Sequence, residues 1–227
     1  MSDQEMKIDQ VLRSHRKSIS LELKRDGRLI VRAPYLATRG QIELLVKSKE
    51  RWIRSKRAIL NQQMLASPPR KFRPGEQFLY LGQPFPLEIV TEQKKLLVLE
   101  DKFYLAARCQ ENPRPVFKDW YRKQAGLVIR ETASLLASQH GFKYERIWIT
   151  AAKTRWGSCG PKGTLNFTWR LVMAPEQVVT YVVTHELVHL RIRNHSSLFW
   201  QEVEKILPDY RAERTWLKDN GYLLSLE

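Results

Sequence analysis

Histidine, cysteine and long apolar runs are all scarce in this chain of 227 residues. There are five histidines and only two cysteines, Cys109 and Cys159, which argues against a disulfide framework. No stretch approaches the 18 consecutive apolar residues of a membrane-spanning helix, and the first residues are polar, without the apolar centre of a signal peptide. We therefore expect a cytoplasmic protein with free thiols and no membrane segment.

Acidic residues are outnumbered, and the positive surplus is larger in the first half of the chain. The net charge is +15; residues 1–110 hold 22 Lys and Arg against 12 Asp and Glu, and residues 111–227 hold 17 against 12. The densest cluster is KSKERWIRSKR at 47–57, on a helix predicted for about 38–62. This basic face can contact nucleotides or nucleic acid through their phosphates, with an ordinary solvated surface as the alternative. The inner face of the helix is expected to consist of Ile42, Leu45, Val46, Ile53, Ile59 and Leu60.

Three of the five histidines lie within eleven positions, in VVTHELVHLRIRNHSSLFW at 182–200. His185 and His189 are four residues apart, so on a helix they share one face and can bind one metal ion. Glu186 projects about 100° around the helix axis from His185, near enough to reach a water on that metal without being a ligand. His195 follows where a third ligand can fold back. The alternative is a set of hydrogen-bonded core histidines.

The surroundings of this motif predict a buried helix. Pro175 suits a first helical position, and valine and leucine then recur on nearly every side of the segment. Burial of two histidines and a glutamate there is costly unless they coordinate something. Asn194 is expected to end the helix in the left-handed conformation, and a second helix to begin near Ser197.

The rest of the chain predicts an α+β fold. Asp26-Gly27 lies between two alternating runs, which indicates a hairpin, and short strands follow the prolines at 68, 69 and 74. A helix is expected at 117–140, ended by Gly141, and then a strand in RIWITAA. The proline-rich ENPRP at 111–115 is the expected boundary between a basic β-rich region, 1–110, and a catalytic domain, 111–227.

Three segments closely resemble the YgjP-like metallopeptidase family, relatives of the SprT and WLM peptidases. They are TRWGSCGPKGTLNFTWRL at 154–171, VVTHELVHL at 182–190 and NHSSLFW at 194–200. The resemblance implies a zincin-like fold with zinc held by His185, His189 and His195, and with Glu186 as the catalytic glutamate. On the same ground the residues expected to line the substrate cleft are Arg155, Trp156, Ser158 and Asn166, with turn and packing chemistry as the alternative.

The function expected from these residues is zinc-dependent hydrolysis of peptide bonds in a polypeptide substrate. Glu186 would act as the general base, and three neutral histidines would leave one metal position open. One alternative is a nucleotide phosphohydrolase of the UTP pyrophosphatase type, and another is a nucleic-acid-associated protein with a structural metal. Cys159 is expected to be an inert thiol rather than a fourth ligand.

Overall fold

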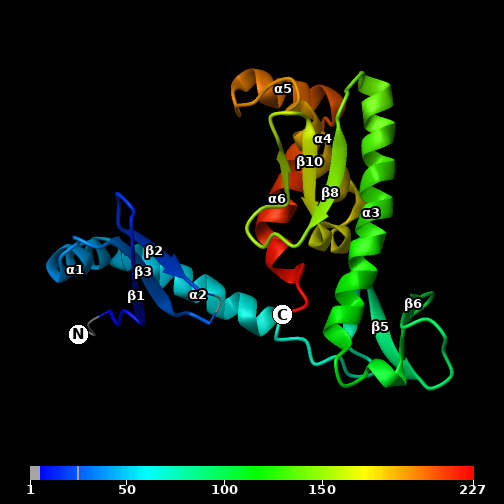
Figure 1. Ribbon diagram of the computed structural model, residues 1–227, viewed down its shortest axis with the longest axis horizontal. Helices are drawn as coiled ribbons and strands as arrows, with labels where there is room; N and C mark the ends of the chain where they lie inside the picture. The colour runs from blue at the N-terminus through cyan, green and yellow to red at the C-terminus, as the bar shows by residue number, and fades with distance from the viewer. Residues whose placement is uncertain (1–5, 25) are drawn as a thin grey trace. The chain divides into compact units, whose positions relative to one another are not determined.

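The computed structural model of the protein describes residues 6–24 and 26–227 (Figure 1). These residues contain ten strands, which form three small sheets, and six α-helices. The fold is therefore mixed α+β, as the sequence predicts. The chain divides into two compact units, Met1–Pro69 and Arg70–Glu227. None of the helices in the described ranges is long and apolar enough to cross a membrane.

The first unit is a three-stranded sheet with two helices. Its elements are β1 (Gln10–Ser14), β2 (Ser20–Leu23), β3 (Leu29–Pro34), α1 (Arg39–Ser48) and α2 (Glu50–Ala66). The strand order is β1–β3–β2, with β2 antiparallel and β1 parallel to β3, so the hairpin predicted around Asp26-Gly27 is confirmed. Alternate residues of β3 form the core with apolar residues of the helices: Leu29, Val31, Ala33, Ile42, Val46 and Ile53.

The basic run does not lie on one continuous helix as predicted. α1 ends at Ser48 and α2 begins at Glu50, with Lys49 between them. The side chain of Ile59, expected in the inner face, is 45% exposed. An α-helix turns by 100° per residue, so Ile59, six residues after the buried Ile53, points about 120° away from it around the helix axis. Leu60, one residue later, points in nearly the same direction as Ile53 and is buried.

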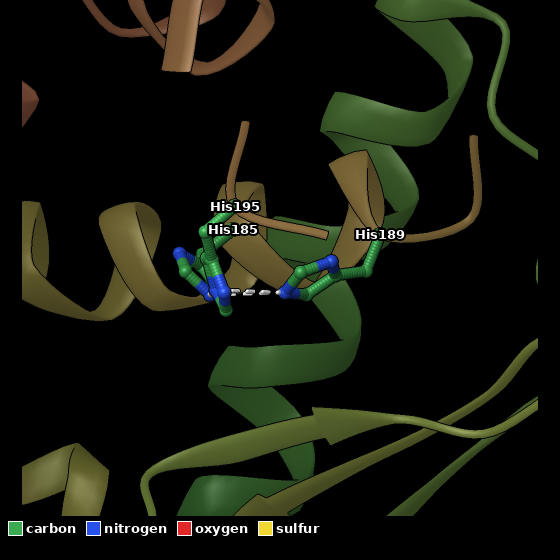
Figure 2. Close-up of side chains that lie close together, drawn as sticks. All are labelled: His185, His189 and His195. Carbon is green, nitrogen blue, oxygen red and sulfur yellow. Dashed lines mark hydrogen bonds between the residues drawn. The ribbon is translucent and has the colours of Figure 1, made fainter. Parts of the chain in front are cut away.

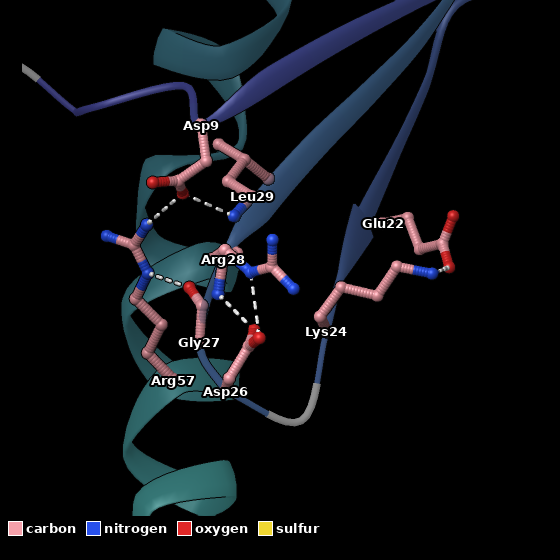
Figure 3. A network of polar contacts seen from close by, with 8 residues as sticks. All are labelled: Asp9, Glu22, Lys24, Asp26, Gly27, Arg28, Leu29 and Arg57. Carbon is pink, nitrogen blue, oxygen red and sulfur yellow. Dashed lines mark hydrogen bonds and ion pairs between the residues drawn. The ribbon is translucent and has the colours of Figure 1, made fainter.

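Two arginines of the basic run are held by contacts inside the first unit. Arg54 pairs with Glu50 one turn earlier, at 2.6 Å. Arg57 donates to the carbonyl of Gly27 at 3.1 Å and lies 3.9 Å from Asp9, whose carboxylate also accepts from the backbone N–H of Leu29 (Figure 3). The remaining basic residues of the run are exposed and form no ion pair within the described part of the chain: Lys47, Lys49, Arg51 and Lys56.

The second unit holds two sheets and four helices around one continuous core. The first sheet, in the order β4–β5–β7–β6, consists of β4 (Gln77–Tyr80), β5 (Gln83–Val90), β6 (Leu97–Leu99) and β7 (Phe103–Ala106). The second, in the order β8–β10–β9, consists of β8 (Arg146–Thr150), β9 (Gly157–Cys159) and β10 (Thr164–Thr168). The helices are α3 (Pro113–His140), α4 (Glu176–Val188), α5 (Ser197–Ile206) and α6 (Tyr210–Asn220), and a 3₁₀-helix, η2 (Trp169–Met173), follows β10.

The long helix α3 connects the two sheets of this unit. It has proline in its first turn and ends at Gly141, whose φ of 66° is left-handed, so the predicted end of the helix is confirmed. Its first turns pack on the strands through aromatic rings, with Phe117 4.4 Å from Phe78 and 5.3 Å from Phe103 between ring centroids. Further along, α3 contacts β8 and α4 (Figure 1).

The boundary expected at residues 110 and 111 falls inside this compact unit, between β7 and α3. The division by compactness lies after Pro69 instead, within the proline-containing segment that follows the basic helices. The four strands between this division and residue 111, β4–β7, share one core with α3 and α4. The assignment of catalysis to residues 111–227 alone stays a prediction.

The β4–β5 turn rests against the start of α4, and Gly82 makes this contact possible. Leu81 and Gly82 donate their backbone N–H groups to the carbonyls of Val172 and Met173 at 2.9 and 3.2 Å. Gly82 has a φ of +81°, and a Cβ there would lie 2.9 Å from the Cα of Pro175. Gly75 has nearly the same φ, +82°, but open space around it.

Gly82→Ala should therefore destabilise the second unit more than Gly75→Ala. Both variants force alanine into a left-handed conformation, which costs about 1–2 kcal/mol, but only Gly82→Ala adds an overlap, which costs a further ~1–3 kcal/mol. Urea unfolding of both variants measures the difference. Equal destabilisation would show that the turn does not depend on close contact with Pro175.

Candidate metal centre

Helix α4 carries the first two histidines and is buried on most of its surface. Its valines and leucines at 178, 179, 182, 183, 187 and 188 are at most 4% exposed, because α3, α5, α6, β9 and η2 all contact the helix. Pro175 directly precedes the helix, one position earlier than predicted. The helix thus holds His185 and Glu186 in an apolar setting.

The three histidines predicted as ligands converge on one point. The Nε2 atom of His185 lies 3.2 Å from that of His189 and 3.0 Å from that of His195, and the remaining pair is 3.2 Å apart (Figure 2). Three nitrogens bound at 2.0–2.1 Å to one tetrahedral zinc would be about 3.3 Å apart. Within the described residues, this is the only cluster of metal-ligating side chains of that size.

The chain between the second and third histidines differs from the prediction. α4 ends at Val188, and His189 is its C-cap with helical dihedral angles. Asn194 is not left-handed as predicted, because among the described residues other than glycine only Phe72 and Leu81 have a positive φ. The turn is formed instead by backbone bonds from Leu190, Arg191 and Ile192 to the last residues of α4. α5 then begins at Ser197, as predicted.

Hydrogen bonds between the rings cannot account for all three contacts, because each Nε2 atom either donates or accepts and three mutual contacts then include at least one pair of like atoms. The Nδ1 atom of His189 lies 2.9 Å from the carbonyl oxygen of Ile192, which can only accept, so Nδ1 carries the proton and Nε2 presents a lone pair. The Nδ1 atom of His185 is buried without a partner. Three Nε2 atoms that all face one another are suited to a shared cation, so the donor set fits a metal ion.

Burial keeps the first two histidines in the neutral form that a metal requires. Burial, followed by the charges of His189 and His195, lowers the pKa of His185 to about 3. The pKa of His189 is also lowered, mainly by burial. Protons therefore compete weakly for these two rings at neutral pH.

Glu186 lies beside the histidines but is not part of their cluster. Its side chain is 5% exposed, and its Oε2 atom is buried without a hydrogen-bond partner. Burial raises its pKa to about 7, against an opposing effect of the Arg155 charge. The carboxylate lies against Gly157 of β9, where a Cβ would be 2.5 Å from Oε1. Glycine at this position leaves the space that Glu186 fills, a role that the sequence alone did not reveal.

The four residues expected to line a substrate cleft lie on and around β9. Arg155 is exposed, and its charge acts on Glu186. Trp156 is half-buried, and its ring is packed so closely on Gly221 that a Cβ there would be 2.8 Å away. Ser158 and Asn166 are paired across β9 and β10, with the Asn166 amide 3.4 Å from the Ser158 carbonyl. Their roles toward substrate stay a prediction, and the Trp156 contact favours packing for that residue.

Aromatic rings from α5 complete the surroundings of the histidines. Phe199 is fully buried, and its ring centroid is 4.8, 4.5 and 4.9 Å from those of His185, His189 and His195. Trp200 stacks on His195 with centroids 5.8 Å apart. Both aromatic residues lie on the helix predicted to begin near Ser197, but their contact with the histidines depends on the turn before α5.

The surroundings of Cys159 favour the inert thiol that the sequence predicts. It is half-buried, and burial is the main cause that raises its pKa. The guanidinium of Arg193 lies 3.2 Å from its sulfur and 3.0 Å from the Gly160 carbonyl. Cys159 is not among the side chains that cluster with the histidines in the described residues.

In metal-free protein, His185 and Glu186 should have opposite effects on stability between about pH 4.5 and 6.5. The unfolded chain binds a proton at His185 below pH 6.5 and the folded chain only near pH 3, so this residue makes stability rise with pH. Glu186 ionises near pH 4.5 when unfolded and near pH 7 when folded, so it makes stability fall with pH.

In Glu186→Gln the free energy of unfolding should therefore rise with pH more steeply than in wild type, by up to ~1.4 kcal/mol per pH unit. Urea unfolding in a chelator at pH 4.5, 5.5 and 6.5 measures the slope, with wild type as the control. An unchanged slope would contradict the burial of an ionisable Glu186.

Comparison with known proteins assigns the chain to a family. A model described as "YgjP-like, metallopeptidase domain" matches residues 17–220. Among solved structures, the metallopeptidase zymogen abylysin of Pyrococcus abyssi is 24% identical with a TM-score of 0.36, and the match covers 40% of this chain and 93% of that one. The metallopeptidase zymogen jannalysin of Methanocaldococcus jannaschii is 22% identical with a TM-score of 0.36, and that match covers 42% of this chain and 96% of the other. No curated protein matches. Because the family model spans most of its length, the chain belongs to the YgjP-like metallopeptidase family, as its sequence motifs indicated.

Proposed function

We propose that the chain is a zinc-dependent peptidase with a zincin-like active site, in which His185, His189 and His195 hold the metal and Glu186 is the general base. The observation that supports this most strongly is the group of three Nε2 atoms within 3.0–3.2 Å of one another beside a buried carboxylate. When bound, zinc supplies Lewis-acid polarisation of the scissile carbonyl and acidifies a coordinated water.

The choice of zinc rests on the donor set. Imidazole nitrogen suits zinc, whereas magnesium is usually held by carboxylates and water. Structural zinc sites normally close with four protein ligands, and the cluster within the described residues has three. A three-histidine site therefore favours a catalytic metal over a structural one.

Glu186 is suited to move a proton in both directions. Its pKa of about 7 is close to neutral pH, so its carboxylate can accept a proton from the attacking water and later donate it to the leaving amine nitrogen. Its packing on Gly157 fixes the carboxylate next to β9. Proton transfer and substrate binding would then occur at the same strand.

β9 is the proposed binding strand for an extended substrate. Within the described residues it pairs with β10 on one side only, so its other edge can form main-chain hydrogen bonds with a polypeptide. Arg155 precedes this strand and Ser158 lies on it, with Asn166 opposite. These residues, with Trp156 packed behind them, would form the wall of the substrate site.

The two alternatives assign ligand binding to basic residues. A nucleotide phosphohydrolase of the UTP pyrophosphatase type would bind phosphates beside Arg155, and a nucleic-acid-associated protein would use the exposed Lys47, Lys49, Arg51 and Lys56. The three-histidine donor set disfavours the first, and the lack of a fourth ligand in the described cluster disfavours the second. Both remain hypotheses that the same assay can test.

Glu186→Gln should retain about one zinc per chain and lose at least about a hundredfold in hydrolysis, because it keeps the size of the side chain but removes the base. The measurement is turnover of casein and of a nucleotide panel that includes UTP, with zinc content by elemental analysis. His195→Ala is the matched variant, and it should lose zinc as well as activity. Turnover of UTP but not casein would replace the peptidase with the nucleotide hydrolase, and zinc loss in Glu186→Gln would make Glu186 a ligand.

A further inference from the structure

An arginine of α6 lies next to the metal centre and has no role in the proposed chemistry. The guanidinium carbon of Arg214 is 4.5 Å from the ring centroid of Trp200. The same ring stacks on His195 at 5.8 Å and 27°, and on Tyr210 at 5.4 Å and 14°. One indole therefore contacts both a proposed metal ligand and the guanidinium.

Arg214 is exposed and forms no hydrogen bond or ion pair within the described residues. Its neighbour Arg211, three residues earlier on the same helix, is paired with Glu204 at 3.3 Å. A guanidinium offers five N–H donors, and in Arg214 all of them remain open to a ligand. The stacking on Trp200 restricts the guanidinium orientation and so lowers the entropy that binding would cost.

The charges around the metal centre are predominantly positive. Arg155 acts on Glu186 and, like Arg214, has no acidic partner in the part of the chain that the structure describes. Glu186, the acidic residue at the site, is buried. A bound metal would add two further positive charges, so a negatively charged ligand is favoured here.

We infer that Arg214 forms an anion subsite that binds a carboxylate of the polypeptide substrate beside the scissile bond. This inference rests on the proposed peptidase function. A planar guanidinium pairs with a carboxylate through two parallel hydrogen bonds, which lysine cannot reproduce. The carboxylate can belong to an Asp or Glu side chain or to the C-terminus of the substrate. In either case the enzyme selects acidic segments.

The test measures binding rather than turnover, with zinc-loaded full-length Glu186→Gln protein and fluorescence anisotropy. The probes are three fluorescein-labelled decapeptides of otherwise identical sequence. One has central Glu residues and an amidated end, one has Gln instead and an amidated end, and one has Gln and a free C-terminal carboxylate. At low salt, at least one carboxylate peptide should bind at least about tenfold more tightly than the neutral peptide. This preference should weaken as salt is added.

Addition of Arg214→Gln should abolish this preference, and Arg214→Lys should retain part of it. Arg211→Gln is the matched control and should leave the preference intact, because that arginine already has an acidic partner. Zinc content and circular dichroism show that each variant remains folded.

Four results would overturn the inference. Equal binding of all three peptides, or a preference that survives Arg214→Gln, would remove the subsite and leave the peptidase intact. Binding of UTP that depends on Arg214, without binding of any peptide, would assign the subsite to phosphate. The absence of any peptide binding by zinc-loaded protein would contradict the peptidase function itself.

Discussion

The burial of ionisable groups in helix α4 is the constraint on which the rest of the second unit depends. An unpaired imidazole or carboxylate in an apolar interior costs several kcal/mol unless something binds it or changes its protonation. His185 and Glu186 sit among buried valines, and their pKa values move in the directions that favour neutral forms. A metal ion shared by the three histidines would satisfy the rings, and a water bound to that metal would satisfy the carboxylate. Packing of the apolar core does not require buried ionisable groups in α4, whereas metal binding and proton transfer would require them.

The remaining elements of the second unit hold α4 in place. α3 packs along one side of it, and the β4–β5 turn rests through Gly82 on Pro175, the residue that precedes it. β9 approaches so closely that Gly157 can carry no side chain without displacing Glu186. α5 places Phe199 in contact with all three rings. Segments from residue 82 to residue 199 thus support the candidate metal centre, which explains why strands β4–β7 belong to the same compact unit as the histidines.

The sequence predicted what depends on local spacing. His185, His189 and His195 were identified from their positions on and after a helix. The C-terminal end of α3 at Gly141 and the start of α5 at Ser197 were also predicted, whereas α3 begins at Pro113, four residues before the expected start. The prediction that a left-handed Asn194 ends the helix was wrong, since α4 ends at Val188 and neighbouring segments decide how the chain turns. Gly157 and Arg214 were missed for the same reason. The significance of each comes from a contact with a residue that is distant in the sequence.

The most direct test of the account is the position of the metal. Crystals of wild-type protein grown with zinc, measured above and below the zinc absorption edge, give that position without any assumption about activity. The account predicts one anomalous peak at about 2.0–2.1 Å from the Nε2 atoms of His185, His189 and His195, with no fourth protein ligand. A peak coordinated by Cys159 or Glu186, or no peak at the histidines, would contradict it.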